Sequence, residues 1–87
     1  MTDFADYADS PTAPALLCFE ITPNDTALLP RLTKALYIGG GGDLVLRTPL
    51  GTADVTFRNV PAGYILDVRA VAVRATGTSA TAIVGLA

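Results

Sequence analysis

Turn-forming clusters of glycine, proline, asparagine and aspartate interrupt this chain at short intervals and leave no uninterrupted stretch for a long helix. They stand at residues 22–25, 39–43, 49–51, 60–63 and 76–79. The segments between them are short and contain Val, Thr, Tyr and Phe, residues that favour strands. Short strands at this spacing are typical of an all-β sandwich or barrel. The sequence therefore predicts an all-β fold.

Alternation of apolar and polar side chains predicts about six strands between these turns. They cover residues 15–21, 34–38, 44–48, 53–58, 64–75 and 80–86. We expect a small antiparallel β-sandwich or jelly-roll-like domain over residues 15–87. An extended N-terminal arm over residues 1–14, which contains Pro11 and Pro14, is expected to precede it.

One short helical turn is predicted after the first strand. Thr22 can cap it, Pro23 suits its first position, and Asp25 can reach back as in a capping box. Pro30 limits this turn to about one helical turn. The glycine run at 39–42 is expected to be a flexible hairpin turn, because it leads through an acidic residue into a strand and not into a phosphate-binding helix.

The longest predicted strand, residues 64–75, contains a change of phase. Leu66 and Val68 are apolar at even positions, whereas Val71 and Val73 are apolar at odd positions. A shift of one residue sends every following side chain to the other face. Either a bulge lies near Ala70, or the second half of the strand is covered on both faces by a partner chain.

The alternation also defines an expected hydrophobic core, drawn from the inward-facing positions of the predicted strands. Its members are Leu17, Phe19, Ile21, Leu36, Ile38, Leu44, Leu46, Val55, Phe57, Leu66 and Val68.

Composition indicates a subunit more than a solitary monomer. The chain has 87 residues, of which 51% are hydrophobic and 16% charged, whereas a typical domain has about 25% charged residues. A domain of this size buries only about 60% of its unfolded surface. Apolar residues must therefore remain outside unless other chains cover them.

The residue inventory argues against an enzyme and against any cofactor or metal. The chain has no histidine, the commonest general base and metal ligand. Cys18, its single cysteine, lies in an apolar run and is expected to be a small buried hydrophobe. A pI near 4.6 and the absence of a basic cluster argue against nucleic acid. No signal peptide and no stretch of membrane-spanning length is recognised, so no membrane partner is expected.

Charge is distributed unevenly along the chain. Residues 1–30 carry five acids and no base, whereas all six bases lie in residues 31–87. We expect Phe4 and Tyr7 of the arm to insert against another chain, with the acids of the arm near its bases. The acids are Asp3, Asp6 and Asp9, and the bases considered are Arg47, Arg58 and Arg74 of an adjacent copy. A solvated tail is the alternative.

Two further features have competing interpretations. Asp54 and Asp67 could be read as a glycosidase carboxylate pair. Both alternate outward on strands, beside Arg58 and Arg69, so cross-strand ion pairing is expected instead. Tyr64 follows a turn and could stack on a sugar ring, although a core position at the end of a strand is the simpler expectation.

The order of several short motifs resembles that of a known family. The motifs are Ile21-Thr22-Pro23-Asn24-Asp25-Thr26, Ala35-Leu36-Tyr37-Ile38-Gly39, Val55-Thr56-Phe57, Val60-Pro61-Ala62-Gly63 and Ala75-Thr76-Gly77-Thr78-Ser79-Ala80-Thr81. Together they resemble the head spike base proteins of alphaproteobacterial gene transfer agents and related tailed phages. The resemblance covers about 65 residues and leaves out the N-terminal arm.

The resemblance implies a non-enzymatic virion protein, made in the bacterial cytoplasm and placed on the capsid surface. It implies a homo-oligomeric ring, with a pentamer favoured, at the base of the head spike on capsid vertices. Its expected partners are the capsid protein and a spike fibre protein that meets the host surface. The alternative from the residues alone is a small carbohydrate-binding or adhesin module.

Overall fold

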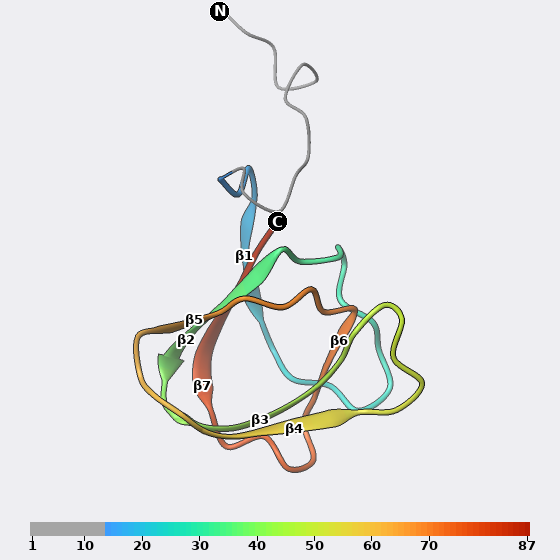
Figure 1. The fold of residues 1–87 in the computed structure, drawn as a ribbon, viewed down its shortest axis with the longest axis vertical. Helices are drawn as coiled ribbons and strands as arrows, with labels where there is room; N and C mark the ends of the chain where they lie inside the picture. The colour runs from blue at the N-terminus through green and yellow to red at the C-terminus, as the bar shows by residue number, and fades with distance from the viewer. Residues whose placement is uncertain (1–13) are drawn as a thin grey trace, which may run out of the picture.

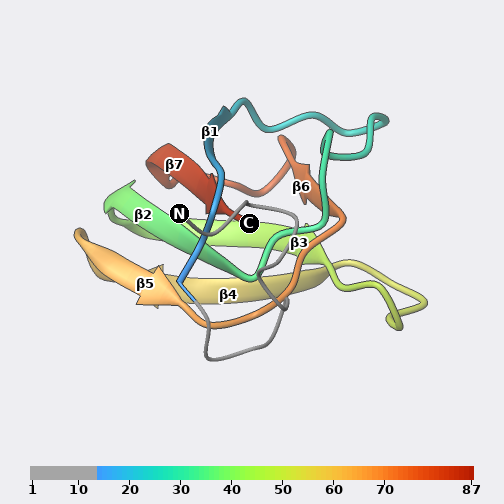
Figure 2. The same ribbon diagram turned by 90° about the horizontal axis from the view of Figure 1, so that it is seen from above.

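The computed structural model describes residues 14–87 and shows two antiparallel sheets packed on each other (Figures 1 and 2). The strands are β1 (Cys18–Ile21), β2 (Ala35–Gly40), β3 (Gly42–Arg47), β4 (Val55–Val60), β5 (Tyr64–Leu66), β6 (Ala72–Arg74) and β7 (Thr81–Leu86). One sheet has the order β1-β7-β2-β5 and the other the order β4-β3-β6. The predicted all-β sandwich is confirmed.

The core lies between the two sheets. The four-stranded sheet contributes Leu36, Ile38 and Ile83, and the three-stranded sheet contributes Leu44 and Leu46. Phe19, Phe57 and Val68 are partly buried against this cluster, as the alternation predicted. Leu17 and Val55 were wrongly placed in the core, since they are 38% and 48% exposed. Leu17 precedes β1, and Val55 begins β4, an edge strand, so neither side chain is covered by a second neighbouring strand.

The predicted hairpin at the glycine run is wrong. β2 and β3 belong to different sheets, so the chain turns a corner between the layers at Gly41 instead of folding back on itself. The neighbouring backbone crowds this corner: a Cβ on Gly41 would lie 2.8 Å from the Val60 carbonyl oxygen and 2.9 Å from the Ala62 nitrogen. Only glycine fits there without moving the backbone of the β4–β5 turn.

The predicted helical turn is also absent from residues 22–30. Asn24, and not Thr22, organises this segment: its Oδ1 accepts hydrogen bonds from the Thr26 and Ala27 amides at 2.8 and 2.9 Å. The Asn24 amide donates to the Val73 carbonyl and the Leu29 amide to the Val71 carbonyl. Because these amides bond across to the segment of β6, they cannot close a helix.

The long predicted strand is two short strands, β5 and β6, in different sheets. Residues 67–71 carry the chain from one layer to the other. The phase change near Ala70 therefore reflects neither a bulge within one strand nor a covering partner. Because β5 and β6 face the core from opposite layers, their inward positions need not share one alternation.

Thr33 holds this crossing segment. Its side chain is fully buried, and its Oγ1 accepts a hydrogen bond from the Ala70 amide at 3.0 Å. Replacing Thr33 by valine is expected to lower the free energy of unfolding by about 1–2 kcal/mol, because the buried amide loses its acceptor. Urea unfolding measures the loss. Thr33→Ser keeps the hydroxyl and serves as control; equal losses in both variants would contradict a role for this hydrogen bond.

Candidate interaction surfaces

The outer face of the four-stranded sheet is almost entirely apolar. Its register places Tyr37 opposite Val84 on one side and Ile65 on the other, while Glu20 lies opposite Val84. The remaining outward positions follow from the strand alternation. We define the apolar face as Cys18, Glu20, Ala35, Tyr37, Ile65, Ala82, Val84 and Leu86. Glu20 is its one charged residue.

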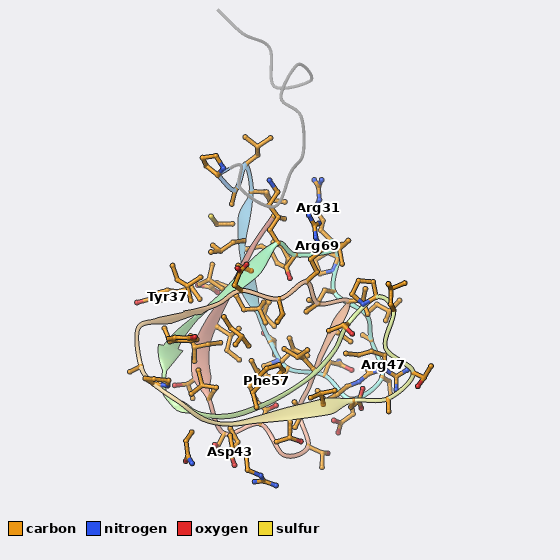
Figure 3. The ribbon with its side chains drawn as sticks, in the orientation of Figure 1. Arg31, Tyr37, Asp43, Arg47, Phe57 and Arg69 are labelled. Carbon is orange, nitrogen blue, oxygen red and sulfur yellow. The ribbon has the colours of Figure 1, made fainter. Side chains whose placement is uncertain are left out.

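Several side chains of the apolar face are open to solvent. Tyr37 is 39% exposed and Ile65 is 54% exposed, and Figure 3 shows Tyr37 directed away from the body of the domain. A shallow hollow of about 260 Å³ lies over β1 and β7, lined by Glu20, Ile21, Thr22, Ala82, Ile83 and Val84. A contiguous exposed apolar surface of this kind marks a site of contact with another molecule.

The outer face of the three-stranded sheet is polar and ion-paired. Asp54 accepts from Arg47 Nε at 3.1 Å and from Arg74 Nε at 3.3 Å. Asp43 pairs with Arg58 Nη1 at 3.2 Å. The expected cross-strand ion pairing of Asp54 is confirmed: β3 and β6 are neighbours in the sheet, which brings Arg47 and Arg74 to the same carboxylate. No ion pair joins Asp67 to Arg69 within residues 14–87.

The predicted arm contacts divide into two groups. Asp3, Phe4, Asp6, Tyr7 and Asp9 lie outside the described residues. Their expected partners, Arg47, Arg58 and Arg74, all have carboxylate partners within the chain.

A second group of cations lies at another end of the domain. Figure 3 shows Arg31 and Arg69 near the end where the described chain begins. Neither forms an ion pair with another residue of the described part of the chain. Arg31 and Arg69 are not among the bases expected for the arm, because the sequence does not show which bases gather at one end of the domain.

The remaining candidates occupy strand edges. Tyr64 opens β5 opposite Ile38 and is 47% exposed; its strand has no neighbour on the other side. Cys18 is exposed, so the expectation of a buried thiol was wrong. Cys18 lies on the outward side of β1, an edge strand, where no second layer covers it.

Asp25 closes the β6–β7 connection from a distant part of the sequence. Its carboxylate accepts from the Thr76 amide at 2.8 Å, the Thr76 hydroxyl at 2.7 Å and the Ala75 amide at 3.0 Å. The Thr76 amide, followed by its hydroxyl, lowers the pKa of Asp25 below the ordinary 3.8. Hydrogen bonds to the charged form explain this direction.

The lowered pKa predicts how the contribution of Asp25 to stability varies with pH. Because the folded-state pKa lies below the unfolded one, the contribution is complete above pH 3.8 and is lost as pH falls through the folded-state pKa. Asp25→Asn is therefore expected to lower the melting temperature at pH 7. The difference in melting temperature between the variant and the wild type should be smaller at about pH 2–3, where the carboxyl group of the unfolded chain is protonated. Thermal unfolding across this range checks the prediction; a constant deficit would contradict it.

No group of three or more His, Cys, Asp or Glu side chains among residues 14–87 could hold a metal ion. No helix in that range is long and apolar enough to cross a membrane.

The structure defines a small all-β sandwich domain with apolar side chains exposed on one outer face and ion pairs on the other. No family model and no curated protein matches the sequence. A chain in a solved structure of the capsid of a native GTA (gene transfer agent) particle, computed with C5 symmetry, matches with a TM-score of 0.84. The two chains are 48% identical, and the match covers 100% of each. The chain belongs to the family of that capsid chain, a family of gene transfer agent structural proteins.

Proposed function

We propose that this protein is a non-enzymatic, cofactor-free virion component that forms the base of the head spike on capsid vertices. It is made in the bacterial cytoplasm, assembles as a five-fold ring, and connects the capsid protein to a spike fibre that meets the host surface. The observation that carries the proposal is the whole-length match to a chain of a capsid computed with C5 symmetry.

The surface of the domain supports an assembling role. One outer face of the sandwich is polar and ion-paired, whereas the other exposes Tyr37 and Ile65. Such asymmetry suits a subunit that presents one face to solvent and the other to a neighbour. The high apolar content of the sequence agrees with this arrangement.

Particle composition tests the proposal directly. Purified particles are imaged with an antibody or a fused tag on this protein, and their proteins are quantified by mass spectrometry. Labelling at vertices, with five copies for each ring, supports the proposal. Absence from particles, while the protein is present in the same cells, would overturn it.

A carbohydrate-binding or adhesin module is the second candidate, favoured by the exposure of Tyr64 (47%) and Tyr37 (39%). Aromatic rings open to solvent present flat apolar surfaces on which sugars can stack. Titration of the full chain with host polysaccharide separates the two candidates. Saturable binding that is lost in Tyr64→Ala favours the module, and vertex labelling without such binding favours the adaptor.

We also propose that the acidic arm docks on an adjacent chain, with Phe4 and Tyr7 as apolar anchors and Asp3, Asp6 and Asp9 facing bases. Arg47, Arg58 and Arg74 already have carboxylate partners in their own chain. Arg31 and Arg69, which have none among residues 14–87, are therefore the more available bases.

Deletion of residues 1–12 tests this docking. We expect the shortened protein to keep its melting temperature within about 2 °C, since an arm outside the core contributes little to it. We expect its attachment to particles to weaken at least about tenfold and to lose part of its salt dependence. Co-sedimentation with particles at several salt concentrations measures both effects. Unchanged attachment with unchanged salt dependence would show that the arm is a solvated tail.

A further inference from the structure

Leu50 is an apolar side chain with almost no cover. It is 97% exposed, and it lies in the connection between β3 and β4. The Gly51 amide donates to the Thr48 carbonyl at 3.1 Å, which closes a tight turn with Pro49 and Leu50 at its two central positions. Residues 48–53 carry no charge. The turn therefore exposes one apolar side chain. The turn itself is short, carries no charge and is restricted in conformation by Pro49.

This turn lies at the opposite side of the domain from β5, the edge strand of the sheet that carries the apolar face. In Figures 1 and 2 the β3–β4 connection forms one lateral extreme of the domain and β5 the other. Figure 3 shows Tyr37 directed outward on the β5 side and Arg47, where β3 ends, on the side of the turn. Each copy thus carries an apolar projection on one side and an apolar surface on the other.

Two different complementary patches on one chain produce a head-to-tail contact. Such a contact closes into a ring when the rotation between copies permits it. A dimer with two-fold symmetry would instead use one patch that matches itself. The five-fold symmetry of the related capsid structure requires the first kind of contact for a ring of this protein.

We propose that the Leu50 turn of one copy docks on the apolar face of the next copy and so forms the repeating contact of the ring. This inference rests on the proposed function for its ring, and it adds the residues that hold the ring together. The occupant of the apolar face is a second copy of this chain, because the chain itself carries an apolar projection on a turn without charge, and a neutral turn can approach a face whose one charged residue is Glu20.

The hollow over β1 and β7 is the place on the apolar face that suits Leu50. Ala82 and Val84 line it with small apolar side chains, and its volume of about 260 Å³ accommodates a leucine side chain. Glu20 also lines the hollow. Its carboxylate would repel a negative charge placed on the turn but not a positive charge.

Charged substitutions at Leu50 test the contact. Leu50→Asp in the full chain is expected to weaken self-association at least about 30-fold, the effect of losing an interface hot spot. Leu50→Lys is expected to weaken it less, and the difference between the two should shrink with salt. Leu28→Asp, at a 69% exposed leucine away from the apolar face, is the matched control. Analytical ultracentrifugation gives the dissociation constants; wild-type association in Leu50→Asp would overturn the proposal.

Cross-linking tests the geometry independently. In a Cys18→Ser background, cysteines at Leu50 and Val84 are expected to form disulfides between copies and to give a ladder that ends at the ring size. Either cysteine alone should give no ladder. Dimers as the largest product, or no cross-linking in a protein that still associates, would overturn the head-to-tail contact.

The two proposals fail in distinguishable ways. Rings that require Leu50 but never occur on particles would contradict the spike-base function and leave the contact standing. Vertex labelling, together with rings that form equally well when Leu50 is substituted, would contradict the proposed contact but not the proposed function.

Discussion

Leu46→Ala is expected to lower the free energy of unfolding by about 2–5 kcal/mol, the range found when a buried leucine is truncated. Leu46 has no exposed surface and lies on β3, the central strand of its sheet, with β4 on one side and β6 on the other. Neither neighbouring strand can move into the cavity without breaking its own ladder. Urea unfolding at fixed protein concentration measures the loss from the midpoint and slope.

The control for Leu46 is Val55→Ala. Val55 is the partner of Leu46 on β4, but it is 48% exposed, so its truncation should cost well under about 1 kcal/mol. Comparison of the two variants therefore distinguishes the effect of removing a buried side chain from the effect of substituting any residue of a strand. A loss of less than about 1 kcal/mol in Leu46→Ala would place Leu46 outside a packed core.

Gly41→Ala is expected to cost about 2–3 kcal/mol, at the upper end of ordinary overpacking. Its Cβ would meet backbone atoms of Val60 and Ala62 at 2.8 and 2.9 Å. Backbone atoms cannot rotate away, so the corner between the two sheets must open. Thermal unfolding measures the loss, and amide hydrogen exchange near residues 60–63 shows whether the corner is the part that loosens.

Gly51→Ala is the matched control for the corner. A Cβ on Gly51 would first meet the Thr48 hydroxyl, at 2.7 Å, and a hydroxyl at the end of a side chain can rotate away. We therefore expect a smaller loss there than at Gly41. Equal losses in the two variants would show that the cost does not arise from the crowded corner, because the lost glycine freedom in the unfolded chain would by itself raise stability in both.

The proposed ring contact and the stability of the domain depend on different residues. Leu46 and Gly41 act within one copy, between its two sheets, whereas Leu50 is 97% exposed and contributes nothing to the core. Substitutions at Leu50 should therefore change association without changing the midpoint of unfolding of the monomer. This separation makes the association experiments interpretable, since a folded monomer remains to be measured.

The sequence by itself determined the class of fold and most of the core. Turn residues at short spacing limit the length of every element, and period-two alternation assigns side chains to two faces. Both are local properties, so Leu36, Ile38, Leu44 and Leu46 were correctly placed inside. The shortage of charge also predicted an uncovered apolar surface, although not its position.

Tertiary structure decided which sheet each strand joins and which side chains meet. The chain changes sheet four times, between β2 and β3, β4 and β5, β5 and β6, and β6 and β7. Alternation within one segment does not report such a change. Asp54 reaches Arg47 and Arg74 because β3 and β6 pair, in a ladder that joins Arg47 to Ala72 and Val45 to Arg74 although 24 residues separate the two strands.

The apolar face has the same origin. It exists because β7 pairs with β1 and β2, which aligns Val84 with Glu20 and Tyr37. These partners lie far apart in the sequence, and their alignment depends on long-range register, for which no local pattern carries information. For the same reason the solvent exposure of Leu50, Cys18 and Val55 follows only from the tertiary structure, which determines the strands that lie beside each side chain.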